Sequence, residues 1–116
     1  MRYYLDCIDP LVYLDVSDLL EQTFAARDVR GIADLNEVIS EGTDTQSVVI
    51  ISARPVAELR AHTAIAILPD DSTGYVLLNG HEEHPAHEGA NWTTIAVPFD
   101  GATLIDAIRR VMPQNS

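Results

Sequence analysis

The chain has 116 residues, 47% of them hydrophobic, and carries 18 acidic against 7 basic side chains, for a formal net charge of -11. This length and apolar content fit one folded domain over residues 1–116 and exclude a disordered chain. The acidic excess excludes a surface built for nucleic acid or for an anionic membrane and favours a protein partner.

The chain also has the features of a cytoplasmic protein. No apolar run reaches the roughly 18 to 20 residues that a bilayer requires, and Asp6 stands where a secretory signal would be apolar. The single cysteine, Cys7, cannot form an internal disulfide. With acids at positions 6 and 9 beside it, we expect Cys7 to be a small buried residue rather than a reactive thiol.

Strands and helices are expected to alternate along the chain. Asp9 and Pro10 are typical of the N-cap and first position of a helix, and apolar residues at helical spacing follow them. Asp34 and Asp100 are expected to cap later helices. The predicted strands lie over 3–8, 28–32, 47–51, 75–78 and 92–97, and the predicted helices over 10–26, around 35–39, from 55 toward 67 and from 101 onward.

Residues 47–51 form the clearest strand, because their run of valine and isoleucine is typical of a central parallel strand covered on both faces. Residues 64–68 are ambiguous, since they continue a helix or form a strand that pairs with 75–78 across a turn. Five strands joined by helices predict a parallel α/β sheet with helices on both faces. In such sheets, ligands bind at the carboxyl ends of the strands.

The segments at these strand ends are 9–12, 48–55, 75–81 and 97–100, with a final helix over 104–111. Taken together, they resemble the receiver domain of two-component response regulators. The most specific piece is Pro98-Phe99-Asp100, which is similar to the end of the family's fifth strand. The resemblance implies a three-layer, flavodoxin-like sheet of five parallel strands in order 2-1-3-4-5.

The resemblance also identifies positions for phosphoryl-transfer chemistry, and this chain departs from the family at each of them. The family uses an aspartate nucleophile after strand three, two acids after strand one that hold Mg²⁺, a lysine after strand five and a Thr or Ser on strand four. A serine forms no acyl phosphate, and isoleucine or valine supplies neither a metal ligand nor a cation. Ser52 stands at the position of the aspartate nucleophile, and Val97 stands at that of the lysine. Cys7 and Ile8 stand at the acidic pair, with Asp9 next to them, and Asn79 stands at the Thr or Ser.

A shift of one residue in the first strand is an alternative alignment. It would bring Asp6 or Asp9 into the pocket and leave a weak metal site. Ser52 and Val97 argue against phosphoryl transfer in either alignment. We therefore predict a domain without enzymatic activity or cofactor.

The sequence accordingly predicts a phosphorylation-independent, receiver-like domain that works by protein–protein contact in a two-component-type pathway. Its expected partner is a histidine kinase or another signalling protein, with a homodimer as a further option. An active receiver with an atypical pocket is the alternative. The family's contact face suggests Trp92, Phe99, Arg109 and Arg110 as surface candidates, although core packing also explains the two aromatic residues.

Three histidines, His81, His84 and His87, lie in an acidic segment and suggest a second alternative, a metal or small-ligand sensor. Pro85 would interrupt a helix that aligned all three, so a solvated loop is the favoured explanation of the segment and we expect no metal. A hydrolase and a nucleotide enzyme are both disfavoured. Ser52 has no surrounding Gly-x-Ser-x-Gly elbow, and the chain has no glycine-rich phosphate loop.

Overall fold

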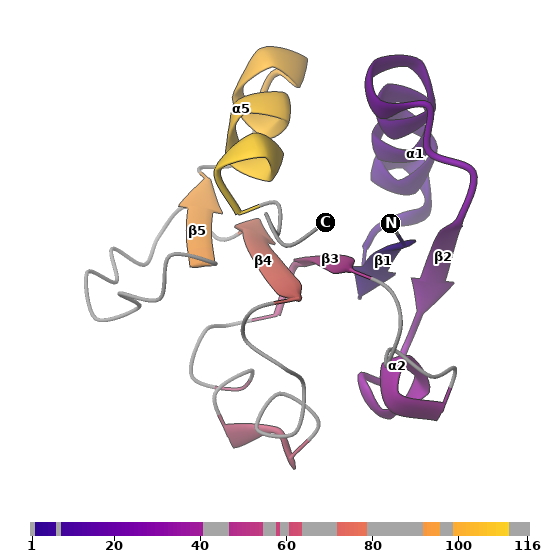
Figure 1. The fold of residues 1–116 in the computed structure, drawn as a ribbon, viewed down its shortest axis with the longest axis vertical. Coiled ribbons are helices and arrows are strands. Elements are labelled where there is room, and N and C mark those ends of the chain that lie inside the picture. The colour runs from indigo at the N-terminus through magenta and orange to yellow at the C-terminus, as the bar shows by residue number, and fades with distance from the viewer. Residues whose placement is uncertain are drawn as a thin grey trace.

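A parallel five-stranded sheet organises the chain (Figure 1). The computed structural model describes residues 2–6, 8–40, 47–54, 58, 61–63, 72–78, 92–95 and 99–111. The order is β2-β1-β3-β4-β5, and every neighbouring pair runs parallel, so the predicted fold class and strand order are confirmed. The strands are β1 Arg2–Asp6, β2 Val29–Ile32, β3 Val48–Ser52, β4 Thr73–Leu78 and β5 Trp92–Ile95.

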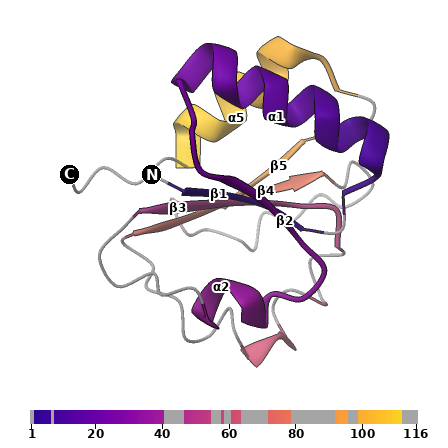
Figure 2. The ribbon, with the colours of Figure 1, turned by 90° about the vertical axis from the view of Figure 1, so that its right-hand side faces the viewer.

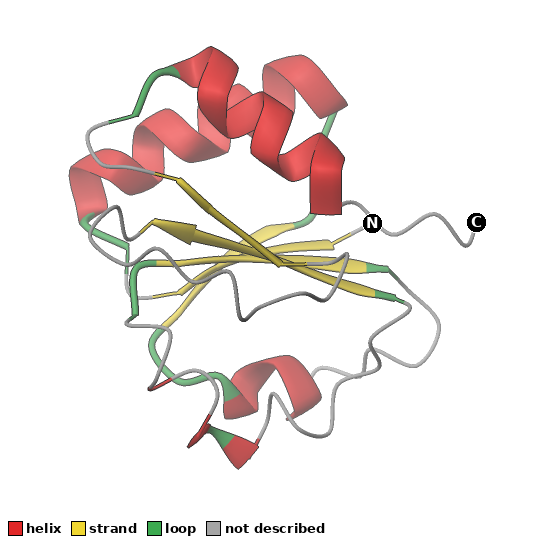
Figure 3. Cartoon of the chain, turned by 90° about the vertical axis from the view of Figure 1, so that its left-hand side faces the viewer, coloured by secondary structure: helices red, strands yellow, loops and turns green. Residues whose placement is uncertain are grey.

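Helices cover both faces of the sheet and complete three layers. Helices α1 (Pro10–Phe24) and α5 (Gly101–Val111) lie together on one face, and α2 (Asn36–Ser40) lies on the other (Figures 2 and 3). None of the helices in the described ranges is long and apolar enough to cross a bilayer.

The two apolar cores follow the alternation of side chains along the strands. In β3, Val49 and Ile51 belong to the core beneath α1 and α5, whereas Val48 and Ile50 belong to the core beside α2. All five residues of β3 are buried, which explains why its sequence is apolar without alternation. The same alternation carries into Ser52, which therefore points toward the α2 side of the sheet.

Helix α1 begins where the sequence predicts and ends earlier. The Asp9 carboxylate accepts a hydrogen bond from the Leu11 backbone N–H at 2.9 Å, and Pro10 occupies the first turn. The predicted span 10–26 shortens to Phe24 because Ala25 adopts the left-handed conformation, at a φ of 53°. The Ala26 N–H then closes the end by donating to the Leu20 carbonyl at 3.3 Å.

The strand boundaries also differ from expectation by a few residues. The strand predicted over 3–8 ends at Asp6, because its partners β2 and β3 end opposite it at Ile32 and Ser52. Of the helix predicted from position 55, only Glu58 and residues 61–63 lie in the described ranges. The ambiguous segment 64–68 lies outside them.

Glycine is required in β4 because α5 passes directly over it. A Cβ atom at Gly74 would collide with the carbonyl oxygen of Val111, at the end of α5. We expect Gly74→Ala to lower the free energy of unfolding by about 1 to 3 kcal/mol, the usual cost of overpacking. Gly101→Ala is the matched control: its Cβ would meet the Leu19 side chain at an ordinary 3.4 Å, and alanine favours a helix. Urea unfolding of the two variants tests this, and equal losses would contradict it.

A second prediction concerns acid stability. Arg2 of β1 donates to the Asp28 carboxylate at 2.8 Å, and this hydrogen bond holds the pKa of Asp28 below its usual range. A depressed folded-state pKa stabilises the fold above the unfolded value of about 3.9, and the gain disappears as pH falls through the folded value. Wild type should therefore lose stability more steeply than Asp28→Asn below about pH 5. Parallel acid slopes in unfolding measurements would refute this.

Candidate functional site

The carboxyl ends of β1 and β3 bring two polar side chains together inside the protein. Asp6 and Ser52 lie opposite each other in the strand register, and both residues are fully buried. Because each follows apolar residues of the α2-side core at spacing two, both point to that face of the sheet. A buried carboxylate requires a compensating charge and hydrogen bonds.

Arg54 supplies that charge. Its Nε donates to Asp6 Oδ2 at 2.6 Å and its Nη2 donates to Oδ1 at 3.1 Å, so the guanidinium and the carboxylate form a bidentate pair. Ser52 Oγ donates to the same Oδ2 at 2.8 Å. The Ser52 hydroxyl oxygen in turn accepts from the Arg54 backbone N–H at 3.1 Å. We call Asp6, Ser52 and Arg54 the Asp6 cluster.

Neighbouring segments accept further hydrogen bonds from the same guanidinium. Nη2 also donates to the Ala33 carbonyl at 2.6 Å, and Nη1 donates to Glu58 Oε1 at 2.8 Å. The Arg54 side chain is only 15% exposed, compared with 52% for Glu58. The cation is therefore enclosed between a fully buried carboxylate and a solvent-facing one.

The turn before α2 is arranged to present the Ala33 carbonyl. Asp34 accepts from the Asn36 N–H at 2.9 Å, and Glu37 Oε2 accepts from the N–H groups of Ala33 and Asp34 at 3.1 Å each. This reciprocal arrangement is a capping box. It fixes the backbone between β2 and α2, which confirms the predicted cap at Asp34. His62 Nε2 lies 3.6 Å from Asp34 Oδ1 at the same edge.

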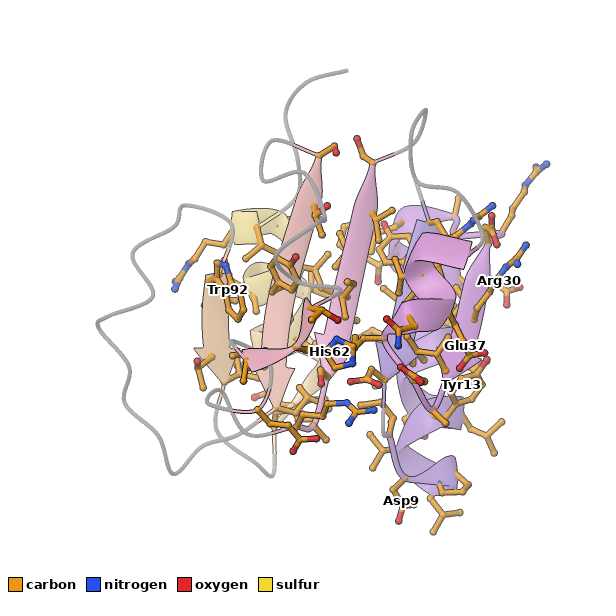
Figure 4. All side chains as sticks on the ribbon, turned by 90° about the horizontal axis from the view of Figure 1, so that it is seen from below. Asp9, Tyr13, Arg30, Glu37, His62 and Trp92 are labelled. Atoms are coloured by element: carbon orange, nitrogen blue, oxygen red, sulfur yellow. The ribbon has the colours of Figure 1, made fainter. Side chains whose placement is uncertain are left out.

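Figure 4 shows how far Asp9 lies from this turn. His62 and Glu37 lie near each other beside the sheet, whereas Asp9 lies at the N-terminal tip of α1. Asp9 is exposed and caps the helix, so it contributes to α1 rather than to the Asp6 cluster. Ile8 packs against the core beneath α1 and α5.

Several predicted site positions lie outside the described residues, and the others are distributed unevenly. Ser52 is the last residue of β3, one position beyond the predicted strand 47–51, and Asp6, which the alternative alignment placed in the pocket, lies beside it. Arg54 was missed, because residues 52–55 suggested only a loop. The sequence did contain a signal for it, because an arginine two residues after one strand can reach an acid at the end of the neighbouring strand in the sheet. The positions outside are Cys7, Asn79, Val97, His81, His84 and His87.

The four surface candidates do not form one patch. Trp92 stacks on Tyr75 at a ring-centroid distance of 4.3 Å and packs against the α2-side core. Phe99 packs on the opposite side of the sheet, against the core beneath α1 and α5. The Arg109 guanidinium lies 5.8 Å from the Phe24 ring of α1, and Arg110 pairs with Asp106 at 3.2 Å.

The described part of the chain contains no group of three or more His, Cys, Asp or Glu side chains arranged to hold a metal ion. In the Asp6 cluster, the acid already has a cationic partner. The arrangement therefore neutralises its own charge.

Comparison with other proteins assigns no family: no protein-family model, curated protein or solved structure matches the chain.

Removal of Arg54 should be costly because it leaves the Asp6 carboxylate buried without a partner. We expect Arg54→Met, which keeps an apolar stem, to lose about 3 to 5 kcal/mol of unfolding free energy. Glu58→Gln removes only the exposed partner and should cost no more than about 1 kcal/mol. Chemical denaturation of both variants measures the difference.

The double variant Asp6→Asn/Arg54→Met separates charge from packing. Because the asparagine is neutral, the double variant should recover part of the stability that Arg54→Met loses. The double variant could instead lose as much stability as Asp6→Asn and Arg54→Met lose in total when each is measured alone. That result would show that the ion pair does not couple Asp6 to Arg54.

Proposed function

We propose that the chain is a receiver-like signalling domain that acts through protein–protein contact, without phosphoryl transfer, enzymatic activity or cofactor. The observation that carries the proposal is the Asp6 cluster, in which Arg54 occupies both oxygens of the buried carboxylate at the carboxyl edge of the sheet. Such edges are where parallel α/β sheets place their chemistry.

Two requirements of phosphoryl transfer conflict with this cluster. The acceptor would have to be Ser52, whose hydroxyl already donates to Asp6, and a serine forms no acyl phosphate. A divalent cation at Asp6 would have to displace a guanidinium held by three oxygen-bearing groups. The site therefore favours a carboxyl edge at which Arg54 always neutralises Asp6, over one whose charge changes with phosphorylation.

Charge supports the choice of a protein partner. A net charge of -11 repels phosphate backbones and anionic lipid and attracts basic protein surfaces. A histidine kinase or another signalling protein of a two-component-type pathway is the proposed partner, and the cytoplasm is the proposed compartment.

Treatment with acetyl phosphate and Mg²⁺, followed by intact-mass measurement, tests the absence of phosphoryl transfer. The protein should retain its unmodified mass under conditions that phosphorylate an authentic receiver in parallel. A partner captured on the immobilised domain should also bind equally well before and after the treatment. A stable phosphoryl adduct, or binding that changes with the treatment, would overturn the proposal.

A further inference from the structure

The outer edge of β2 presents backbone hydrogen-bonding groups that no strand in the described ranges pairs with. Strand β2 is the last in the sheet order, and Figure 1 shows it at the outer margin of the sheet, beyond β1. The Tyr3 N–H donates to the Asp28 carbonyl at 2.9 Å, and Tyr3 lies opposite Val29 in the parallel register. This pattern turns the backbone groups of Asp28 and Arg30 toward β1. The N–H and C=O groups of Val29 and Gly31 therefore point away from the sheet.

The charges at this edge are of both signs. An open strand edge is a template for another strand, and proteins often block it with charged side chains. Asp28 and Arg30 lie two positions apart and so share one face of the sheet. The Arg30 Nε donates to Asp28 at 3.0 Å, and the two side chains are 45% and 31% exposed. Figure 4 shows Arg30 at this outer side of the molecule. Such an edge accepts a strand whose charges run in the opposite order.

A second copy of the same edge has its charges in that order when it runs antiparallel with Val29 opposite Val29. The two valines then form a hydrogen-bonded pair, because the backbone groups of both point outward. Asp28 of each copy faces Arg30 of the other, which gives two cross-strand pairs of opposite charge. A register with Arg30 opposite Arg30 would set like charges against each other. The charges therefore select one register.

We propose that two copies of this chain pair through their β2 edges, antiparallel and centred on Val29, so that one continuous sheet runs through a two-fold symmetric dimer. The assembly is closed, because each copy uses the same edge. Strand β5, at the other end of the sheet, contains only tryptophan, threonine and isoleucine and has no charge to set a register.

The net charge of -11 on each copy opposes this association, whereas the cross-strand pairs favour it. At physiological salt, the repulsion between exposed charges is screened beyond about 8 Å, but the cross-strand pairs lie in direct contact. The balance therefore permits a dimer that dissociates on dilution. The proposal concerns assembly and does not depend on the proposed signalling role.

Sedimentation velocity of the full chain over a concentration series at physiological salt tests the dimer. Arg30→Asp gives the edge a single sign and should abolish dimerisation. Arg110→Asp is the matched control, because it changes the net charge equally at an exposed residue of α5 and should leave the dimer intact. Circular dichroism confirms that each variant is folded. A wild-type chain that stays monomeric up to about 1 mM, or equal effects of the two variants, would overturn the proposal.

Mixing two variants separates contact across the interface from damage within one copy. Asp28→Arg makes the edge entirely positive, so this variant alone should remain monomeric. Mixed with Arg30→Asp, it should form a heterodimer, because every cross-strand pair again has opposite charges. Mixing cannot repair a folding defect, so recovery would identify the contact itself. Two folded variants that fail to associate when mixed would refute the charge pairing.

A cysteine at the two-fold axis tests the register without changing the charges at positions 28 and 30. The Cα atoms of a hydrogen-bonded antiparallel pair lie about 5.5 Å apart, within the reach of a disulfide. With Cys7 replaced by serine, Val29→Cys should give a disulfide-linked dimer on mild oxidation. Arg30→Cys faces position 28 of the other copy and should give far less. Non-reducing mass spectrometry measures both yields, and equal yields would contradict the register.

Discussion

A carboxylate buried between two strands has to be paired, and the carboxyl edge of this sheet is organised around that constraint. Asp6 is inaccessible to solvent, and its partner Arg54 comes from beyond the end of β3. The same guanidinium reaches the carbonyl of Ala33 before α2. One cation therefore joins β1, the β2–α2 turn and the segment after β3. The geometry of the edge follows from the requirement to neutralise one acid.

The sequence predicted the architecture well because the signals involved are local. The valine and isoleucine run of β3 indicated a central strand, and Asp9 with Pro10 indicated the start of α1. The predicted strand ends were less accurate, because a strand ends where its pairing with the neighbouring strands ends. The first strand was predicted to run to Ile8, but its ladders with β2 and β3 end at Asp6, opposite Ile32 and Ser52.

The site was harder to predict for the same reason. Ser52 was found because it ends an obvious strand. Arg54 was not, because its bond to Asp6 spans 48 positions and depends on the register between β1 and β3. Trp92 and Phe99 are close in sequence and were grouped together, yet they pack on opposite sides of the sheet. Composition indicates which residues are available for contact, whereas the topology decides which of them share a face.

The hydrogen bond between Ser52 and Asp6 limits which substitutions the carboxyl edge tolerates. An aspartate at position 52 would set two negative charges at hydrogen-bonding distance against the one guanidinium of Arg54. Loss of Arg54 alone would leave Asp6 isolated in the interior. Each single step toward a cation-binding edge therefore passes through a less stable protein, and only coordinated changes avoid that penalty. Each member of the Asp6 cluster is therefore costly to replace while the other two remain.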